Sequence, residues 1–524
     1  MKKILFFTAV LGVLNICSAQ DSVFSYTHQG TTLYYVIDNN GDAAVVPPLY
    51  PYTFFSTDTV TIEAWDGHIK PQGSVVIPDS VPYGGINHAV KTIDFCALYL
   101  CDSITDVTIP ATIQEIDSSA FEGCKSLTSV VIPQGVTTID YSAFYNCTAL
   151  QTVTMSEGVT SIGNYAFGEC LSLTSINLPS TLGRLGYGSF RFDTSLVSVV
   201  IPAGIDTLRY YTFECCFNLQ SVTLPENLRC IQDACFEACF SLQSVTLPEG
   251  LSFIGDAAFK DCVSLQTISL PGSLQTINTD AFYYCTGLQS VTLSEGITSI
   301  GEFAFSECYK LQSFNLPSTL VNLAGAAFQL DTSLTAITIP TGVDSIGQWA
   351  FCGCLNLQSV EFSEGLRSIG TNAFDTCINL LHITLPSTLM RIGNHSFEDC
   401  LSLDTITLLC TNPPSIFDST FNSYTATLIV PCGTSDTYHQ HPIWGLFTNI
   451  EEDCNGIEDV ETNNVRVHVI DGRIVVEGAD GETVQVFDME GRMIQTIKHS
   501  SSQPLSTGVY MVKVGDKTIK CLVF

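Results

Sequence analysis

The chain has 524 residues, of which 20 are basic and 52 are acidic, and its formal net charge is −32. A surface of this charge repels phosphate backbones and anionic lipid headgroups, which argues against nucleic acids and membrane surfaces as partners. With 45% hydrophobic residues, the chain is too apolar to be a disordered protein and must bury much of its length.

Residues 1–19 have the pattern of a secretory signal peptide: two lysines, an apolar run that ends at Ile16, and a small residue before the cleavage point. We therefore predict cleavage after Ala19. Cys17 leaves a lipoprotein signal as the alternative, but the bulky residue before it favours the plain signal. No other stretch reaches the roughly 18 apolar residues that span a bilayer, so the mature chain is not expected to be membrane-spanning.

Residues 20–90 lack the repeat that follows them. Segments rich in β-branched and aromatic residues, Tyr26 to Ile37 and Val60 to Trp65, favour strands separated by turns. We predict a small N-terminal β region that caps the repeats, because the end repeat of an array needs a cover.

Asp38, Asn40 and Asp42 have the spacing of the first ligands of a calcium loop. Such a loop needs glycine at its sixth position, where this chain has Ala43, and a bidentate glutamate later on. A plain turn is therefore the favoured interpretation.

Residues 91–430 are predicted to form the repeat region. A 23-residue unit begins near residue 93 and recurs until about residue 408, and one aromatic position recurs at every step without an insertion. A fixed period in this range indicates a solenoid of stacked coils. With strands about 4.8 Å apart, some fourteen coils would make a rod or arc of roughly 65–70 Å. The recurring aromatics are Phe121, Phe144, Phe167, Phe190, Phe213, Phe236, Phe259, Phe282, Phe305, Phe328, Phe351, Phe374 and Phe397.

Within each copy, apolar residues alternate with polar ones nine to eleven positions after the Phe, as in Val291-Thr292-Leu293. This alternation predicts a half-buried strand. The expected fold is mainly β with short helical or 3-10 turns: a leucine-rich-repeat solenoid of 23-residue coils followed by a small C-terminal β-sandwich. A single coil cannot offset the entropy cost of its own ordering, so stacking must stabilise it.

Twelve of the 22 cysteines occur three residues after the aromatic position. Equivalent side chains in stacked coils point the same way, whereas a disulfide needs Cβ atoms that face each other. Buried thiols that donate to a turn carbonyl are therefore favoured, with disulfides and metal ligation as the alternatives. Two coils, 138 residues apart, replace this cysteine with Asp193 and Asp331.

The pattern Ile-Gly-x-x-Ala-Phe-x-x-Cys-x-x-Leu-x-x-Val-x-Leu-Pro, seen almost throughout from Ile300 to Pro317, resembles the BspA-like class of bacterial leucine-rich repeats. The match covers roughly residues 91–409. Residues 431–455 resemble the closing segment of such arrays and are predicted to form a C-terminal cap. Cys432, His439 and His441 could form a metal cluster, but no fourth ligand is evident, so we favour ordinary cap residues and predict no metal and no cofactor.

Residues 456–464 are predicted to be a linker. Residues 465–524 show short strands and Asp-Gly turns, and they are similar to a type IX secretion sorting domain. That resemblance implies export through the type IX machinery, with a sorting signal that includes Gly508, Tyr510, Lys513 and Lys520. An accessory sandwich that stays attached is the alternative.

The side chains between the buried strand positions should point outward as a long, almost uncharged ribbon. Extended solenoid faces are typical binding surfaces, but Ser and Thr also suit a plain solvent-facing strand. Glu361 and His382 depart from the ribbon in neighbouring coils and mark a candidate contact site. The other candidate ligand residues are Ser175, Asn177, Ser221, Thr223, Ser244, Thr246, Ser290 and Thr292.

Exposed aromatics on the turn side, either partner contacts or decoration, are Tyr210, Tyr211, Tyr283, Tyr284 and Trp349. The chain has no catalytic signature such as Gly-x-Ser-x-Gly or His-Glu-x-x-His, so no catalytic residue is predicted.

We expect a non-catalytic, secreted surface adhesin whose partner is a host or bacterial surface protein or glycan, as the BspA-like resemblance implies. A surface hydrolase or carbohydrate-processing enzyme is one alternative. A structural surface-layer spacer without a specific ligand is the other.

Overall fold

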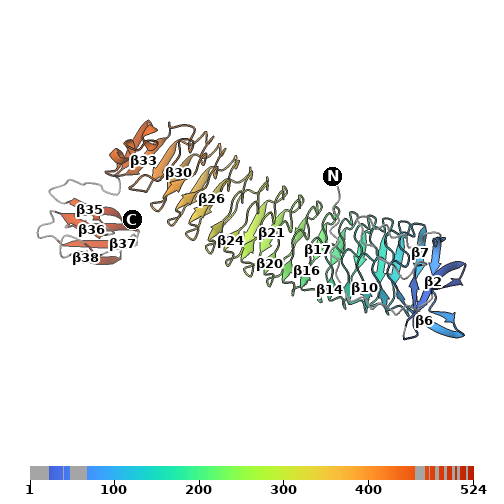
Figure 1. Ribbon diagram of the computed structural model, residues 1–524. Coiled ribbons are helices and arrows are strands. Elements are labelled where there is room, and N and C mark those ends of the chain that lie inside the picture. Colours follow the sequence, from blue (N-terminus) through green and yellow to red (C-terminus); the bar gives the residue numbers. More distant parts are fainter. Residues whose placement is uncertain are drawn as a thin grey trace.

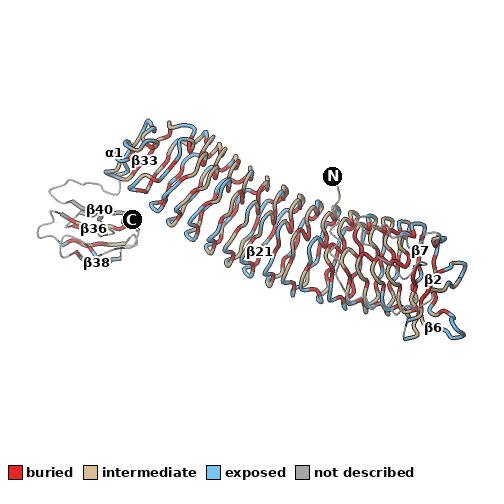
Figure 2. The backbone as a smooth tube through the Cα atoms, viewed as in Figure 1, coloured by how far each residue is buried: buried red, intermediate tan, exposed pale blue. Residues whose placement is uncertain are grey.

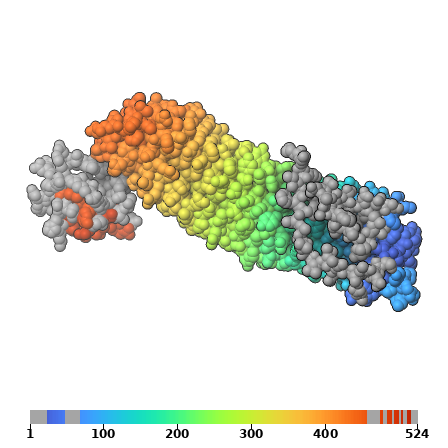
Figure 3. All heavy atoms as spheres, viewed as in Figure 1, coloured from blue at the N-terminus to red at the C-terminus, as the bar shows by residue number. Residues whose placement is uncertain are grey.

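The computed structural model describes residues 23–38, 40–47 and 68–454, and residues 466–523 apart from short gaps at 471–472, 478–482, 489–491, 498–501, 504, 506–507 and 515–516. The predicted leader and linker and the segment from Val60 to Trp65 lie outside these residues. The repeats form one long rod of stacked coils, with a small β domain beyond its C-terminal end (Figure 1). The predicted fold class is confirmed. Where the face shown in Figure 3 is coloured, the colours progress evenly along the rod in the order of the sequence.

One long face of the rod is a parallel sheet with one strand per coil, in the order in which the coils follow the chain. Equivalent residues of successive coils pair directly, as Thr152 pairs with Ser175. Ten strands form its first part: β4 (Gly73–Val76), β7 (Ile104–Thr108), β9 (Ser129–Ile132), β11 (Thr152–Met155), β13 (Ser175–Asn177), β15 (Ser198–Val200), β17 (Ser221–Thr223), β19 (Ser244–Val245), β21 (Thr267–Leu270) and β23 (Ser290–Leu293).

The same face continues in a second sheet, and the two are separated by the coil that contains Phe314. Ser313 makes only an isolated bridge to Ser290, and Figure 1 shows the rod changing direction between β21 and the next sheet. Phe314 stands where other coils have Val or Ile, and its ring packs edge-on against Phe305 and Phe328. The second sheet contains β26 (Ala336–Ile339), β28 (Ser359–Phe362), β30 (His382–Leu385), β32 (Thr405–Leu408), β33 (Thr427–Pro431) and β34 (Asn449–Asp453).

A second, shorter strand in each coil lies five to six residues before the stacked Phe. These strands pair in parallel in three separate runs, which are interrupted between β14 and β16 and between β20 and β22. Its second residue is buried, as Ile139 and Ile300 are. These strands are β8 (Glu115–Ile116), β10 (Thr138–Ile139), β12 (Ser161–Ile162), β14 (Arg184–Leu185), β16 (Thr207–Leu208), β18 (Cys230–Ile231), β20 (Phe253–Ile254), β22 (Thr276–Ile277), β24 (Ser299–Ile300), β25 (Asn322–Leu323), β27 (Ser345–Ile346), β29 (Ser368–Ile369) and β31 (Arg391–Ile392).

The N-terminal strands extend both sheets over the first coil. β3 pairs in parallel with β6, which pairs with β8, while β4 pairs with β7. A salt bridge of 2.8 Å joins Lys91 of β6 to Asp42, just before β3. Its strands are β1 (Phe24–His28), β2 (Thr31–Ile37), β3 (Ala43–Val46), β5 (Ser80–Tyr83) and β6 (Ile86–Ile93).

The core is a column of phenylalanine rings that runs along the rod. Successive rings from Phe121 to Phe421 lie nearly parallel, with centroids 4.9 to 5.8 Å apart. Each ring of the recurring set is 0 to 1% exposed, and buried residues run as a continuous spine through the coils (Figure 2). Offset parallel stacking is a favourable arrangement for aromatic rings, and burial of large apolar side chains dominates core energetics.

The turn around each Phe differs from the helical or 3-10 turn expected from the sequence. Residues two before and two after the Phe adopt left-handed backbone conformations, as Ser142 (φ 51°) and Asn146 (φ 57°) do around Phe144. Their amides, and that of the Phe itself, donate to carbonyls of the next coil; Phe144 N lies 2.7 Å from Ala166 O. The cost of the left-handed residues is therefore offset by hydrogen bonds that require a neighbouring coil.

The twelve repeating cysteines are buried free thiols, as predicted. In most coils the thiol donates to the carbonyl of the Phe one coil earlier; Cys262 Sγ lies 3.2 Å from Phe236 O, and Cys285 Sγ lies 3.2 Å from Phe259 O. Burial raises the pKa of Cys262 well above its ordinary value, so the thiol keeps its proton and its donor role.

Asp193 and Asp331 occupy the position of this thiol and are 0% exposed. In each case Oδ1 accepts a hydrogen bond of 2.8 Å from the amide of the cysteine one coil earlier, Cys170 or Cys308. The Oδ2 atoms are buried and accept none. Burial raises the pKa of both carboxyls well above the usual range. Burial therefore favours the protonated, neutral form of both carboxyls.

The repeats end in a cap built from α1 (Ser435–His439), the 3-10 helix η1 (Trp444–Leu446), β33 and β34. Trp444 and Tyr438 are fully buried, and the Tyr438 hydroxyl donates to Cys410 O at 2.7 Å. The edge strand β34 carries Glu451, Glu452 and Asp453, and charged edges of this kind oppose pairing with a further strand.

The C-terminal domain consists of two small antiparallel sheets around its own core. One sheet contains β35 (Arg466–Ile470) and β36 (Arg473–Glu477). The other contains β37 (Val484–Asp488), β38 (Met493–Ile497), β39 (Gly508–Val514) and β40 (Lys517–Val523). Of the predicted sorting residues, Gly508 begins β39, Tyr510 is buried in it, Lys513 is exposed on it, and Lys520 belongs to β40.

Candidate functional site

From β9 of the first sheet to β26 at the start of the second, the strand face presents a surface with no charged residue. Its positions lie seven, eight and ten residues after the stacked Phe in ten consecutive coils, and all are exposed except the half-buried Ser129. We call this surface the neutral strip. It consists of Thr128, Ser129, Val131, Gln151, Thr152, Thr154, Thr174, Ser175, Asn177, Val197, Ser198, Val200, Gln220, Ser221, Thr223, Gln243, Ser244, Thr246, Gln266, Thr267, Ser269, Gln289, Ser290, Thr292, Gln312, Ser313, Asn315, Thr335, Ala336 and Thr338.

The eight hydroxyl and amide residues singled out from the sequence all lie on this strip and point away from the core. Register aligns them into columns: Ser198 pairs with Ser221, and Ser221 pairs with Ser244. Hydroxyl groups therefore recur once per coil along the axis of the rod.

Sequence reasoning missed one column of the strip. Gln220, Gln243, Gln266, Gln289 and Gln312 are exposed in five successive coils. Each of these glutamines comes directly before the outward-pointing Ser or Thr that begins the alternating segment. From the sequence, we considered only residues within that segment, so the prediction did not include the glutamines. The recurring triplet Leu-Gln-Ser or Leu-Gln-Thr is the signal that would have found it.

Glu361 and His382 lie together just beyond the end of the strip. β28 and β30 are paired, with Ser359 opposite His382 and Glu361 opposite Thr384. These four residues, with Val360 and Phe362, line an open hollow of about 260 Å³. Glu361 Oε2 also accepts a hydrogen bond of 3.0 Å from the hydroxyl of Thr338, at the last coil of the strip.

This hollow is not an assembled nucleophilic triad. Within residues 68–454, no hydrogen bond joins His382 to Ser359 or to Glu361, although such a triad needs its members in hydrogen-bond reach. The groups present are one carboxylate, one imidazole and hydroxyls, which can donate to and accept from a ligand's polar groups.

A second hollow, of about 230 Å³, lies where the regular coils meet the cap. Phe397, Cys400, Leu403 and Phe421 supply most of its apolar lining. The step from Phe397 to Phe421 is 24 residues rather than 23. Leu401, which also lines this hollow, is 74% exposed.

The turn-side aromatics are partly committed to packing within the chain. The guanidinium of Arg191 lies 5.5 Å from the Tyr211 ring, and Lys260 Nζ lies 5.2 Å from the Tyr283 ring. Tyr210, Tyr284 and Trp349 remain 37 to 43% exposed.

The carboxyls at the N-terminal end serve the local backbone. Asp38 Oδ1 accepts hydrogen bonds of 2.8 Å from the amides of Asn40 and Asp42, which is the plain turn expected there. Asp94 caps the amide of Phe95 at 2.7 Å. Burial, with a further contribution from Asp117, raises the pKa of Asp94 to about 7.

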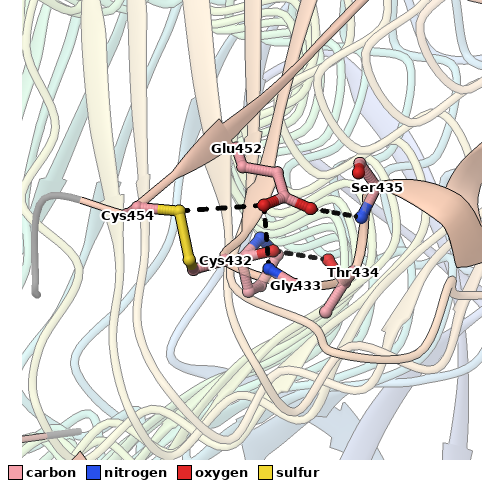
Figure 4. Close-up of a disulfide and its surroundings, with 7 residues drawn as sticks. Cys432, Gly433, Thr434, Ser435, Glu452 and Cys454 are labelled. Carbon is pink, nitrogen blue, oxygen red and sulfur yellow. Dashed lines mark hydrogen bonds between the residues drawn. A yellow bond between two sulfur atoms is a disulfide. The ribbon is translucent and has the colours of Figure 1, made fainter. Parts of the chain in front are cut away.

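The side chains of metal-binding type that lie close together at the cap are Cys432, Glu452 and Cys454. From the sequence, we considered Cys432 together with His439 and His441. Cys432 forms a disulfide with Cys454 (Figure 4), so its sulfur is not available as a thiolate ligand. Glu452 lies beside this bond. His439 Nδ1 is 2.8 Å from Ser435 O, while His441 Nδ1 accepts from backbone amides, which matches their interpretation as cap residues.

Glu452 closes the cap from the edge strand. Its two carboxylate oxygens accept hydrogen bonds from Ser435 N at 2.8 Å and Gly433 N at 2.9 Å (Figure 4). Hydrogen bonds from Ser435 and Gly433 lower the pKa of Glu452 to about 2. Disulfide and carboxylate together fasten β33 to β34 at the point where the described solenoid ends.

Removal of this disulfide should loosen the cap and leave the middle coils unchanged. For the double variant Cys432→Ser/Cys454→Ser we expect a loss of about 2–4 kcal/mol in the local opening free energy of β33 and β34, because the bond closes a loop of 22 residues in sequence. Hydrogen exchange of peptides from these strands measures it.

The matched control is Cys230→Ser/Cys352→Ser, which changes two half-buried free thiols and should leave exchange in the cap unaltered. Thiol counting on the denatured, unreduced protein gives an independent result. Reactivity of Cys432 and Cys454 without a reductant would contradict the assignment.

Comparison with known proteins identifies the repeats and leaves the C-terminal domain unassigned. The profile of the BspA type leucine rich repeat region matches residues 91–219, 206–334 and 323–435. A domain of unknown function (DUF6383) matches residues 455–523. No curated protein matches the chain.

Among solved structures, a leucine-rich repeat protein from Bacteroides ovatus is 24% identical, with a TM-score of 0.56, and the match covers 83% of this chain and 98% of that one. A leucine rich cell surface protein from Faecalibacterium prausnitzii is 24% identical, with a TM-score of 0.44 and coverage of 74% and 95%. The first likeness supports the fold. None of the helices in the described part of the chain is long and apolar enough to cross a bilayer.

Proposed function

Because the chain belongs to the BspA-type leucine-rich repeat family, we propose that it is a non-catalytic adhesin at the cell surface that captures its ligand on the strand face. The observation that carries this proposal is the neutral strip. In a chain with a net charge of −32, ten successive coils have no charged residue at these three strand positions, all of which are exposed except Ser129. A strand face that only needed to stay in water would gain solubility from charged residues.

We propose the same ligand-contact residues as were predicted from the sequence. Ser175, Asn177, Ser221, Thr223, Ser244, Thr246, Ser290 and Thr292 would supply hydroxyl and amide contacts along the strip. Glu361 and His382 would form a polar subsite in the hollow at its end.

Export to the cell surface is the second part of the proposal. The leader cleaved after Ala19 and a C-terminal type IX sorting domain would direct it, and the Cys432–Cys454 disulfide is of the kind that persists in oxidising compartments. Mass spectrometry of the exported chain tests this. We expect an N-terminus at Gln20 and a C-terminus before residue 465, and retention of the intact sorting domain would contradict it.

The binding function is tested with the full-length chain on an array of immobilised host matrix proteins, bacterial surface proteins and glycans, together with a panel of hydrolase substrates. Saturable, ligand-specific binding is the expected result. Turnover of a substrate would instead support the surface hydrolase. The absence of both binding on the array and turnover of a substrate would support a structural spacer.

A further inference from the structure

We propose that the neutral strip takes an extended, neutral polysaccharide that lies along the axis of the rod. This inference rests on the proposed function and names its ligand class. It is carried by the composition of the strip, by its shape and by the apolar side chains beside it.

Composition argues against a protein partner. Eighteen of the strip's side chains carry hydroxyls and eight carry amides, and none is aromatic, arginine or methionine. Protein interfaces concentrate their binding energy in buried Trp, Tyr and Arg anchors, which this surface lacks. A protein surface docked here would also have to bury its own charges against uncharged groups, and that desolvation is costly.

Charge restricts the ligand further. The chain as a whole repels anions, while the strip offers no carboxylate to attract a cation. The ligand that fits is neutral and brings many hydrogen-bond donors and acceptors of its own, because each hydroxyl or amide that loses water must gain a partner. A neutral sugar polymer has this chemistry.

Shape and period favour a polymer over a small molecule. The first eight coils of the strip are in-register strands of one sheet, and the coil of Ser313 and the first strand of the second sheet continue it. With about 4.8 Å per coil, the ten coils extend for roughly 45 Å. Equivalent groups recur at each coil, as the pairings of Ser198 with Ser221 and of Ser221 with Ser244 show. A chain of sugar units laid along the axis would meet the same side chains at every step.

Apolar side chains occur in the turn that leads into the strand, three residues before the Gln column. Phe217 and Phe240 stack with ring centroids 4.9 Å apart, and Phe240 is 41% exposed. Leu171 occupies the same position two coils before Phe217 and is also 41% exposed. Sugar rings have C–H faces as well as hydroxyl edges, so a partly apolar border beside a polar strip suits them.

The test is affinity electrophoresis of the full-length chain in native gels that contain galactomannan, xyloglucan, laminarin or dextran. We expect at least one of these neutral polymers to retard the wild-type chain. We expect the variant Gln243→Glu/Gln266→Glu, which adds two charges to the strip, to lose at least tenfold in apparent affinity.

The control variant is Gln134→Glu/Gln275→Glu, which adds the same charge at exposed glutamines outside the strip and should bind like the wild type. The inference is overturned if none of the four polymers retards the wild-type chain. It is also overturned if the strip variant and the control variant bind equally well or lose affinity to the same extent. If a protein on the array is instead bound by the wild type and lost by the strip variant, the polysaccharide assignment fails while the proposed strand-face function stands.

Discussion

Truncation of one ring in the phenylalanine column should cost about 3–5 kcal/mol of stability. Phe259→Ala is the test, because this ring is 0% exposed and stacks on both neighbours, at 5.2 and 5.3 Å. The cavity would face two coils at once, so we expect the loss to spread to the coils of Phe236 and Phe282. Urea unfolding gives the overall change, and hydrogen exchange of the flanking coils shows its extent.

Phe253→Ala is the matched control. Phe253 belongs to the same coil but is 42% exposed, so its truncation should change stability by less than about 1 kcal/mol. Equal losses in the two variants would mean that the column does not hold the coils together.

The second large effect is a pH dependence that arises from Asp193 and Asp331. Burial raises both pKa values in the folded chain above the unfolded value of about 3.9. Folding therefore takes up a proton at each site above pH 4. The stabilisation is fully present below that pH and is lost as the pH rises toward the folded pKa, at about 1.4 kcal/mol per pH unit for each group.

The variant Asp193→Asn/Asp331→Asn should remove this slope. An Asn can accept the amide of Cys170 or Cys308 with its oxygen and offers N–H donors without taking up a proton. In urea unfolding from pH 5 to pH 8, the difference in unfolding free energy between this variant and the wild type should shift in favour of the variant as the pH rises. The variant Asp206→Asn/Asp344→Asn, which changes two exposed carboxyls, controls for the loss of two charges. If the wild type and both variants show the same dependence of stability on pH, the protonation of Asp193 and Asp331 on folding is contradicted.

Periodicity was sufficient to predict the solenoid, the phenylalanine column and the repeating thiols. Each of these depends on contacts between identical positions of adjacent coils, so a fixed spacing in sequence translates directly into a spatial neighbour. Phe121 and Phe144 stack because both occur at the same place in a 23-residue coil.

Features that break the repeat could not be obtained in this way. The Cys432–Cys454 bond joins two cap positions that have no counterpart in other coils, and periodicity contains no information about them. The hollow at Glu361 and His382 was predicted only in part. The sequence showed that these two residues depart from the ribbon, but their arrangement around Ser359 depends on the local pairing of β28 with β30.

The turn geometry was missed for a different reason. Left-handed conformations usually favour glycine, yet this chain places Tyr165, Tyr211 and Trp349 at such positions. Local propensity gives no hint of this. The conformation is imposed by hydrogen bonds to the next coil, which exist only when the stack has formed.

The central claim is that binding takes place on the strand face and not on the turn side. The direct measurement is a surface scan, against whichever member of the protein and glycan array retains the wild-type chain. Ser221→Glu and Ser290→Glu change the strip, while Tyr211→Ala and Trp349→Ala change the turn side. We predict at least tenfold weaker binding for the two strip variants and wild-type binding for the other two. Loss of binding in the Tyr211 and Trp349 variants alone would contradict the account.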